Sequence, residues 1–295
     1  MATHTVYKPK RTGPLTRFRG LHGFQHLDKI GNENSPLALF LLPFATKDVV
    51  YDCNDFTEDT INLDYWAINT GSGATNFAIL TGVTGGQIRG NTGTTDNSAC
   101  SLIGPAIWKG DHGCTMEIRW QVNAITSLYF ELGFVDVVTD TSLPVTGDLG
   151  TPAIASNGSG DTALLVMDTD DTPATAGLFT DGTTTNMNST LTVNFGRPGG
   201  VSTWTPVAGV WNTTRISIQG DAASVFTEAE TNGSNGISYY WAGHGDATAN
   251  RTEGGSLVAP WIFFGTRNTT AKLAYVDYVR VWQNRIARAV TETIP

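Results

Sequence analysis

Short runs of alternating or β-branched residues, separated by Gly, Asn and Asp, make up this 295-residue chain from about residue 51 onward. A period of two places successive side chains on opposite faces of a strand, and Gly, Asn and Asp favour the turns between strands. No segment of twelve residues keeps the 3.6-residue period of an amphipathic helix. The pattern predicts twelve strands: Asp64–Asn69, Phe77–Thr81, Gln87–Gly90, Cys114–Val122, Leu128–Val138, Ala163–Asp168, Ala176–Thr180, Leu191–Phe195, Arg215–Gln219, Ala223–Thr227, Trp261–Thr266 and Leu273–Gln283.

The number of strands favours an all-β fold of two large antiparallel sheets. About twelve strands are more than an immunoglobulin domain holds, and they suit a jelly-roll sandwich. No internal repeat indicates a solenoid or a propeller. Only 15% of the residues are charged and 33 are Gly, a composition that excludes a coiled coil. The longest apolar run, Leu37–Ala45, contains Pro43 and is much shorter than the roughly 20 residues of a membrane span, so no membrane partner is expected.

Two of the strands show which side chains are expected to share a face. In 128–136, one alternating set is expected in the core between the sheets: Leu128, Phe130, Leu132 and Phe134. The other set is expected on an outer or concave face: Tyr129, Glu131, Gly133 and Val135. In 275–284, strict alternation predicts one set of Val276, Tyr278, Arg280 and Trp282, and another of Tyr275, Asp277, Val279 and Val281. An Arg or Asp buried by this alternation would need a partner.

The segment 275–284, which reads Tyr-Val-Asp-Tyr-Val-Arg-Val-Trp-Gln-Asn, resembles the closing strand of the concanavalin A-like jelly rolls of the laminarinase type. The segments 55–57 (Asp-Phe-Thr) and 60–66 (Thr-Ile-Asn-Leu-Asp-Tyr-Trp) are similar to the opening of those folds. The resemblance covers residues 51–284 and implies two sheets of six or seven strands, one of them concave. It divides the chain into a basic, extended N-terminal arm with an anchor segment (1–50), the jelly roll (51–284) and a C-terminal tail (285–295).

Hydrolysis in the laminarinase-like enzymes requires two carboxylates that flank the glycosidic bond, and the family carries them on one strand as Glu-x-Asp-x-x-Glu or a shorter variant. The best-placed strand of this chain has Glu131, but Gly133 stands where the middle Asp is expected, and the last acid is absent or displaced to Asp136. Glu228 and Glu230 share a face but lack a third acid. The chain is therefore predicted to be non-catalytic, and no Gly-x-Ser-x-Gly, nucleotide-binding or Cys/His metal spacing indicates other chemistry.

The formal charge of −9 is divided unevenly along the chain. Residues 1–30 carry six basic side chains and one acid, a charge of +5, whereas the other 265 residues carry 12 basic and 26 acidic side chains, a charge of −14. Such a segment can dock on an acidic surface, or it can be a solubilising terminus. The candidate partner-binding residues are Lys8, Lys10, Arg11, Arg17, Arg19 and Lys29.

Aromatic and acidic side chains give two further candidate sites. Aromatic rings can stack on sugars, or they can pack in the core or at a subunit interface. The candidate glycan-binding residues are Trp204, Trp211, Tyr240 and Trp241. Asp168, Asp170 and Asp171 can form a structural calcium site or a solvated turn, and no other cofactor is expected. Cys53, Cys100 and Cys114 are expected to be buried thiols, with a Cys100–Cys114 disulfide as the alternative.

The opening and closing segments also resemble those of virion proteins of tailed bacteriophages. This resemblance implies a capsid decoration or cement protein on the outer surface of the capsid, where the arm binds the major capsid protein and the body contacts other copies of itself. An acidic body disfavours direct contact with nucleic acid. The alternative is a host-recognition module that binds a surface glycan. The third hypothesis is a glycosidase with an atypical acid pair that includes Glu131.

Overall fold

The computed structural model describes residues 49–284, apart from the segments 71–73, 137–159, 171–173, 182–192, 198–199, 202–203, 231–236 and 245–254 and residues 175, 195 and 221. The chain divides into two units, Met1–Val50 and Tyr51–Pro295, and the described residues belong almost entirely to the second. No helix in this described part is long and apolar enough to cross a membrane.

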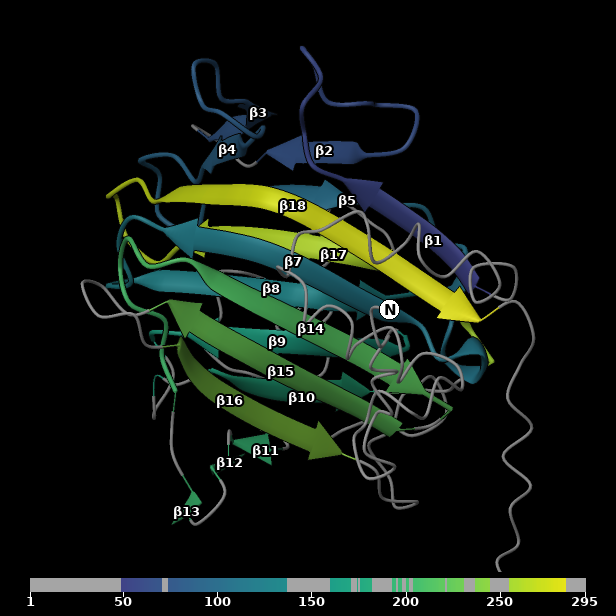
Figure 1. Cartoon of the computed structure of the whole chain (residues 1–295). Coiled ribbons are helices and arrows are strands. Elements are labelled where there is room, and N and C mark those ends of the chain that lie inside the picture. The colour runs from purple at the N-terminus through teal and green to yellow at the C-terminus, as the bar shows by residue number, and fades with distance from the viewer. Residues whose placement is uncertain are drawn as a thin grey trace, which may run out of the picture. The chain divides into compact units, whose positions relative to one another are not determined.

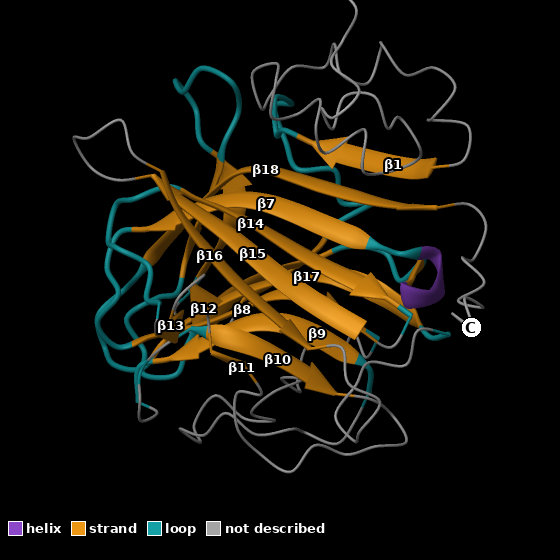
Figure 2. Ribbon diagram, turned by 60° about the horizontal axis from the view of Figure 1, so that its bottom comes forward, coloured by secondary structure: helices purple, strands orange, loops and turns teal. Residues whose placement is uncertain are grey.

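The second unit is a sandwich of two antiparallel sheets, which Figure 1 shows face-on and Figure 2 shows as two layers. Sheet A contains, in spatial order, β13 (Gly200–Val201), β12 (Gly196–Arg197), β16 (Ile237–His244), β15 (Ala222–Glu230), β14 (Asn212–Gln219), β7 (Thr115–Val122), β18 (Leu273–Asn284), β4 (Ile88–Asn91) and β3 (Thr75–Ile79), with β1 (Val49–Asn54) paired to β18. Sheet B contains β11 (Val193–Asn194), β10 (Gly177–Asp181), β9 (Thr162–Asp168), β8 (Leu128–Val135), β17 (Leu257–Thr266), β5 (Ala99–Ile103) and β2 (Ala67–Thr70), with β6 (Trp108–Lys109) paired to β17. A 3-10 helix, Gly110–His112, follows β6.

The predicted all-β, two-sheet antiparallel jelly roll is confirmed, and each of the twelve predicted strands overlaps an observed one. The sequence pattern missed β1, β5 and β16 among the longer strands. All five residues of β5 are buried, so its sequence lacks the alternation that marks a strand with one wet face. The two sheets hold ten and eight strands, more than the six or seven that the family resemblance implies.

The core between the sheets is centred on Trp120 of β7. Its ring lies 5.0 Å from Phe130 and 5.8 Å from Phe264, which belong to sheet B, and 6.4 Å from the ring of Trp204. The indole Nε1 donates a hydrogen bond of 2.9 Å to Oγ1 of Thr214, whose hydroxyl lies 3.1 Å from that of Thr227. An acceptor stabilises a buried indole N–H, and β14 supplies it from the neighbouring strand of the same sheet.

A β-bulge in β18 changes the predicted faces of this strand. The register shifts between Val276, which pairs with Trp120, and Tyr278, which pairs with Arg119, so Asp277 is the extra residue. The alternation therefore reverses after the bulge. The inward set is Val276, Val279 and Val281, and the outward set is Tyr275, Asp277, Tyr278, Arg280 and Trp282. The predicted strict alternation is wrong because it would have buried Arg280 together with Val276, whereas the bulge leaves all three valines in the core.

Replacing Trp120 with alanine is expected to lower the free energy of unfolding by about 3–5 kcal/mol, because the change removes a ring that packs against both sheets. Urea denaturation measures the effect. Leu63→Ala is the control, since this side chain is 69% exposed and its removal is expected to cost less than about 0.5 kcal/mol. A loss below about 1 kcal/mol for Trp120→Ala would contradict this role of the ring.

Candidate functional site

Strand β8, on which the family resemblance would place catalytic acids but whose acid pattern is incomplete, is buried on both faces. Phe130 faces the inter-sheet core, where it contacts Trp120 and Phe264. The opposite face of sheet B also carries an apolar cluster, in which side chains of β8 pack beside those of the adjacent strands. The buried members are Ala99, Ile103, Tyr129, Val135, Leu164, Val166, Phe179, Ala259, Trp261 and Phe263. The face predicted to be outer or concave is therefore a second buried layer.

Glu131 lies within this second layer and has no exposed surface. Its carboxylate accepts hydrogen bonds from the hydroxyl of Tyr129 and, at 2.8 Å, from Nε1 of Trp261. The ring of Trp261 is stacked parallel to that of Phe263, with centroids 6.0 Å apart. A carboxylate that is enclosed and bonded to two aromatic residues is held as a structural group, because water and a polysaccharide do not reach it.

Gly133 occupies the position at which the laminarinase-like pattern has its middle acid. Its φ of +150° is one that L side chains rarely adopt, and a Cβ there would lie 2.1 Å from the carbonyl oxygen of Ala163. Asp136 follows the end of β8, where its backbone N–H donates to the carbonyl of Asp161 at 2.9 Å. The closely packed β9 backbone therefore leaves no room for an acid at 133, and β8 does not present the carboxylate pair that glycoside hydrolysis requires.

The outward face of sheet A carries ionised side chains that bond to one another. Glu117 of β7 is buried. Its carboxylate forms ion pairs with the guanidinium groups of Arg215, from β14, and of Arg280, from β18, the latter at 3.3 Å. The Tyr278 hydroxyl donates to the same carboxylate at 3.1 Å. Burial and the nearby Glu117 carboxylate raise the pKa of Tyr278 above its ordinary value. Burial alone would lower the pKa of Arg280, but the Glu117 carboxylate raises it, so this side chain stays charged.

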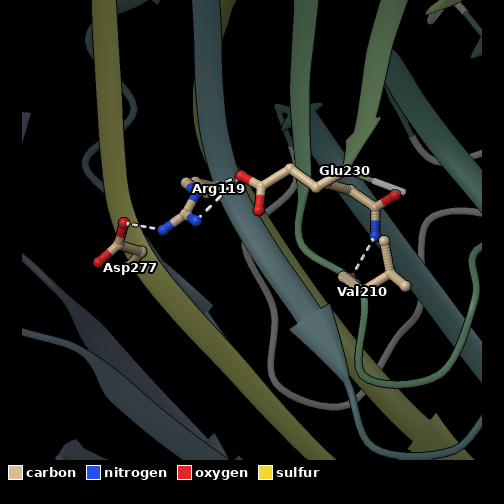
Figure 3. A network of polar contacts seen from close by, with 5 residues as sticks. Arg119, Val210, Glu230 and Asp277 are labelled. Carbon is tan, nitrogen blue, oxygen red and sulfur yellow. Dashed lines mark hydrogen bonds and ion pairs between the residues drawn. The ribbon is translucent and has the colours of Figure 1, made fainter. Parts of the chain in front are cut away.

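A second group on this face, the Arg119 cluster, consists of Arg119, Trp211, Glu230 and Asp277. Figure 3 shows the Arg119 guanidinium between Asp277, at 2.6 Å, and Glu230, at 3.0 Å. The same guanidinium lies 4.4 Å from the ring centroid of the half-buried Trp211. Burial alone would lower the pKa of Arg119, but its hydrogen bonds to Asp277 and Glu230 raise it. The cluster thus combines an aromatic ring with a fixed cation and a carboxylate that is 51% exposed.

Of the four predicted glycan-binding residues, the structure places the side chains of Trp204 and Trp211, and they lie in different surroundings. Trp204 is 3% exposed and meets Trp120 edge-on, so it packs in the core. Trp211 is half-buried on the Arg119 cluster. Tyr240 and Trp241 belong to β16 and pair with Thr227 and Phe226, but their side chains are not among the described ones. Only Trp211 of the four is thus seen at the surface.

The three acids of the predicted calcium site, Asp168, Asp170 and Asp171, do not share one environment, because Asp168 forms an ion pair with Arg267. The two oxygens of the buried Asp168 carboxylate accept hydrogen bonds from Nε, at 3.0 Å, and Nη2 of the equally buried Arg267. Asp168 therefore has a cation of the protein itself as its partner, while Asp170 is exposed and Asp171 lies outside the described residues. Within the described residues, no group of three His, Cys, Asp or Glu side chains is placed to hold a metal ion.

The three cysteines are free thiols. Cys100 and Cys114 are buried as expected, whereas Cys53 is exposed, so the expectation of a buried thiol is wrong for Cys53. Burial raises the pKa of the Cys100 thiol to about 12. The disulfide that was the alternative for Cys100 and Cys114 is not formed.

The predicted partner-binding residues of the arm, Lys8 to Lys29, lie outside the described residues, so this prediction stands as made from the sequence. The two ionic groups on sheet A were missed by sequence reasoning. Glu117 and Arg119 both belong to β7, but their partners Arg215, Glu230 and Asp277 come from other strands, and no sequence spacing links them. The one sequence pattern that could have indicated this charged face is the alternation within 115–121, which places Glu117 and Arg119 on the same side of a strand.

No family model and no curated protein sequence matches the chain. Among solved structures, a protein of unknown function from Shewanella oneidensis MR-1 is 12% identical, with a TM-score of 0.51 over 85% of this chain and 94% of that one. The calcium-bound exoplasmic domain of VIP36 is 7% identical, with a TM-score of 0.49 over 81% and 93%. A glycosyl hydrolase family protein from Mycobacterium fortuitum is 13% identical, with a TM-score of 0.45 over 78% and 98%. At these identities, the likeness concerns the fold alone.

Gly133→Ala is expected to prevent stable folding or to lower the free energy of unfolding by more than about 3 kcal/mol, because the new methyl group overlaps the β9 backbone. Thermal and urea denaturation measure this loss. The matched control is Gly209→Ala: its φ is +72° but no atom lies within 4 Å of the added Cβ, so it is expected to cost only about 1 kcal/mol. Equal losses for the two variants would show that the Ala163 contact is unimportant.

Proposed function

We propose that this chain is a non-catalytic structural protein of a virion, a decoration protein on the outer surface of the capsid that binds the major capsid protein through residues 1–30. The proposal that the chain is non-catalytic rests on the buried outer face of β8, where Glu131 is enclosed and Gly133 has no room for a side chain. The separation of a +5 segment from a −14 remainder supports the mode of binding.

The construction of the sandwich is consistent with this proposal. The outward face of sheet A holds its charges in fixed pairs such as Glu117 with Arg280 and Arg119 with Asp277. A face of this kind is rigid and polar, and it stays soluble while many copies are held close together on a shell. Contacts that are individually modest become strong when they are repeated over a lattice. The resemblance of the opening and closing segments to tailed-phage virion proteins supports the placement in a virion.

Replacing Lys8, Lys10 and Arg11 together with glutamate is expected to weaken binding to capsid shells by at least about tenfold, because the charge of the arm changes from +5 to about −1. Co-sedimentation with shells that lack this protein measures binding. Binding of the natural chain is also expected to weaken as salt rises, because exposed charges are screened. Lys109→Glu, which changes a partly exposed charge of the sandwich, is the control. Unchanged binding of the arm variant would refute the docking proposal.

A second candidate function is glycan binding at the Arg119 cluster, and one observation favours it. Trp211 is an aromatic ring at the surface beside the exposed carboxylate of Glu230 and the fixed guanidinium of Arg119. A ring for stacking and oriented polar groups for hydroxyls are the components of a sugar site. In this reading the sandwich is a host-recognition module.

A glycan array with the full chain tests this second candidate. Trp211→Ala is expected to reduce the signal of any bound glycan at least about tenfold, because stacking is lost. Ile107→Ala, which alters another exposed apolar residue, is expected to keep the signal. A natural chain that binds no glycan, or a signal that is equal in both variants, would count against the site.

A further inference from the structure

Strand β3 forms one edge of sheet A. Its residues pair with β4 on one side, and within the described part of the chain no strand pairs with its other side. Thr75, Asn76 and Ala78 of this strand are exposed, whereas Phe77 points into the core and contacts Phe264. An edge of this kind presents backbone N–H and C=O groups to which a further strand can pair.

A cleft of about 110 Å³ lies beside this edge. Its lining residues come from β3, β4 and the residue that follows β3: Thr75, Asn76, Ala78, Ile79, Leu80, Arg89 and Asn91. Arg89 is exposed and pairs in register with Ala78 of β3 and Tyr275 of β18, so it lies one strand in from the edge. Its guanidinium has no hydrogen-bond or ion-pair partner among the described residues, whereas Arg119, Arg215, Arg267 and Arg280 each bind a carboxylate.

We infer that the edge of β3 is a docking site for residues 290–294 of a second copy of this chain, which add a strand to sheet A and place Glu292 in the cleft against Arg89. The inference is independent of the proposed function, since it concerns contacts between copies and needs no capsid.

The sequence of this segment fits an added strand. Residues 290–294 read Val-Thr-Glu-Thr-Ile, five residues of which four are β-branched, and β3 itself has five residues. With a period of two, Val290, Glu292 and Ile294 share one face. That face offers one carboxylate for Arg89, with an apolar side chain on either side of it along the cleft. Glu292 is the one acidic residue between 285 and 295, so charge complementarity fixes the register.

The reach of the chain requires that this segment come from another copy. The part of β18 that is nearest to β3 is Val276, which pairs with Ile88, and Ile88 pairs with Ile79. From Asn284 back to Val276, an extended strand covers about 26 Å. The six residue steps from Asn284 to Val290 span at most about 22 Å. The tail of the same copy therefore cannot place Val290–Ile294 along β3.

The contact joins two different surfaces, the β3 edge of one copy and the tail of the next. Such a head-to-tail contact leaves a free edge and a free tail at the two ends of each assembly, so it generates a series of oligomers or a closed ring rather than a two-fold dimer. Sedimentation velocity of the full chain over a range of concentrations is expected to show species larger than a dimer.

Charge exchange tests the pairing. Arg89→Glu and Glu292→Arg are each expected to raise the dissociation constant between copies at least about tenfold, because each places two like charges together. The double variant is expected to return to within about threefold of the natural chain. A synthetic peptide of residues 286–295, added in excess, is expected to compete for the edge, and the same peptide with Glu292→Gln is expected to compete less well.

The controls separate this contact from other causes. Both single variants are expected to keep the thermal midpoint of the natural chain, since Arg89 is exposed and bonds to none of the described residues. Leu257→Ala, which alters an exposed residue on sheet B, is expected to leave association unchanged. The inference is overturned if the natural chain is monomeric up to about millimolar concentration, if Arg89→Glu associates normally, or if the double variant is not restored. It is also overturned if removal of residues 1–30 abolishes association while Arg89→Glu does not.

Discussion

The contact between the two sheets through Trp120 is the interaction on which the arrangement of the other elements depends. The indole belongs to sheet A but packs against Phe130 and Phe264 of sheet B, and its Nε1 is satisfied by Thr214 from the adjacent strand. Because its ring packs against sheet B while its N–H bonds to Thr214, this residue links the positions of β7, β14, β8 and β17. The bulge in β18 has the same cause, since it keeps Val279 and Val281 against this core.

The second buried layer decides what the jelly roll can do. In a sandwich with one wet concave face, an acid on that face can act on a ligand. Here Glu131 is enclosed by Tyr129 and Trp261, and the nearby buried carboxylate of Asp168 is paired with Arg267, whose guanidinium lies 4.9 Å from the ring centroid of Tyr129. Burying carboxylates without donors would cost several kcal/mol, so each acid comes with its own partners. On sheet A, the described polar groups at the surface include those of the Arg119 cluster and of the β3 edge.

Much of the fold could be predicted from the sequence because its signal is local. Alternation marked strands such as β7 and β15, and it failed for β5 and for the second half of β18, where burial on both faces or a single extra residue removes the period of two. The candidate sites were less predictable. A half-buried Trp211 and a core Trp204 look alike in sequence, and the pairing of Asp168 with Arg267, 99 residues away, leaves no local trace.

The sequence by itself determined the all-β class, the two-sheet sandwich and the uneven charge, because residue composition, period and net charge are properties of neighbouring residues. It also determined that the acid pattern of the laminarinase-like strand is incomplete, since Gly133 stands in it. Only the tertiary structure decided that Glu131 is enclosed by aromatic residues, that one bulged residue, Asp277, completes the Arg119 cluster, and that Arg89 has no carboxylate partner among the described residues. The reason is that burial and charge pairing depend on which distant strands become neighbours.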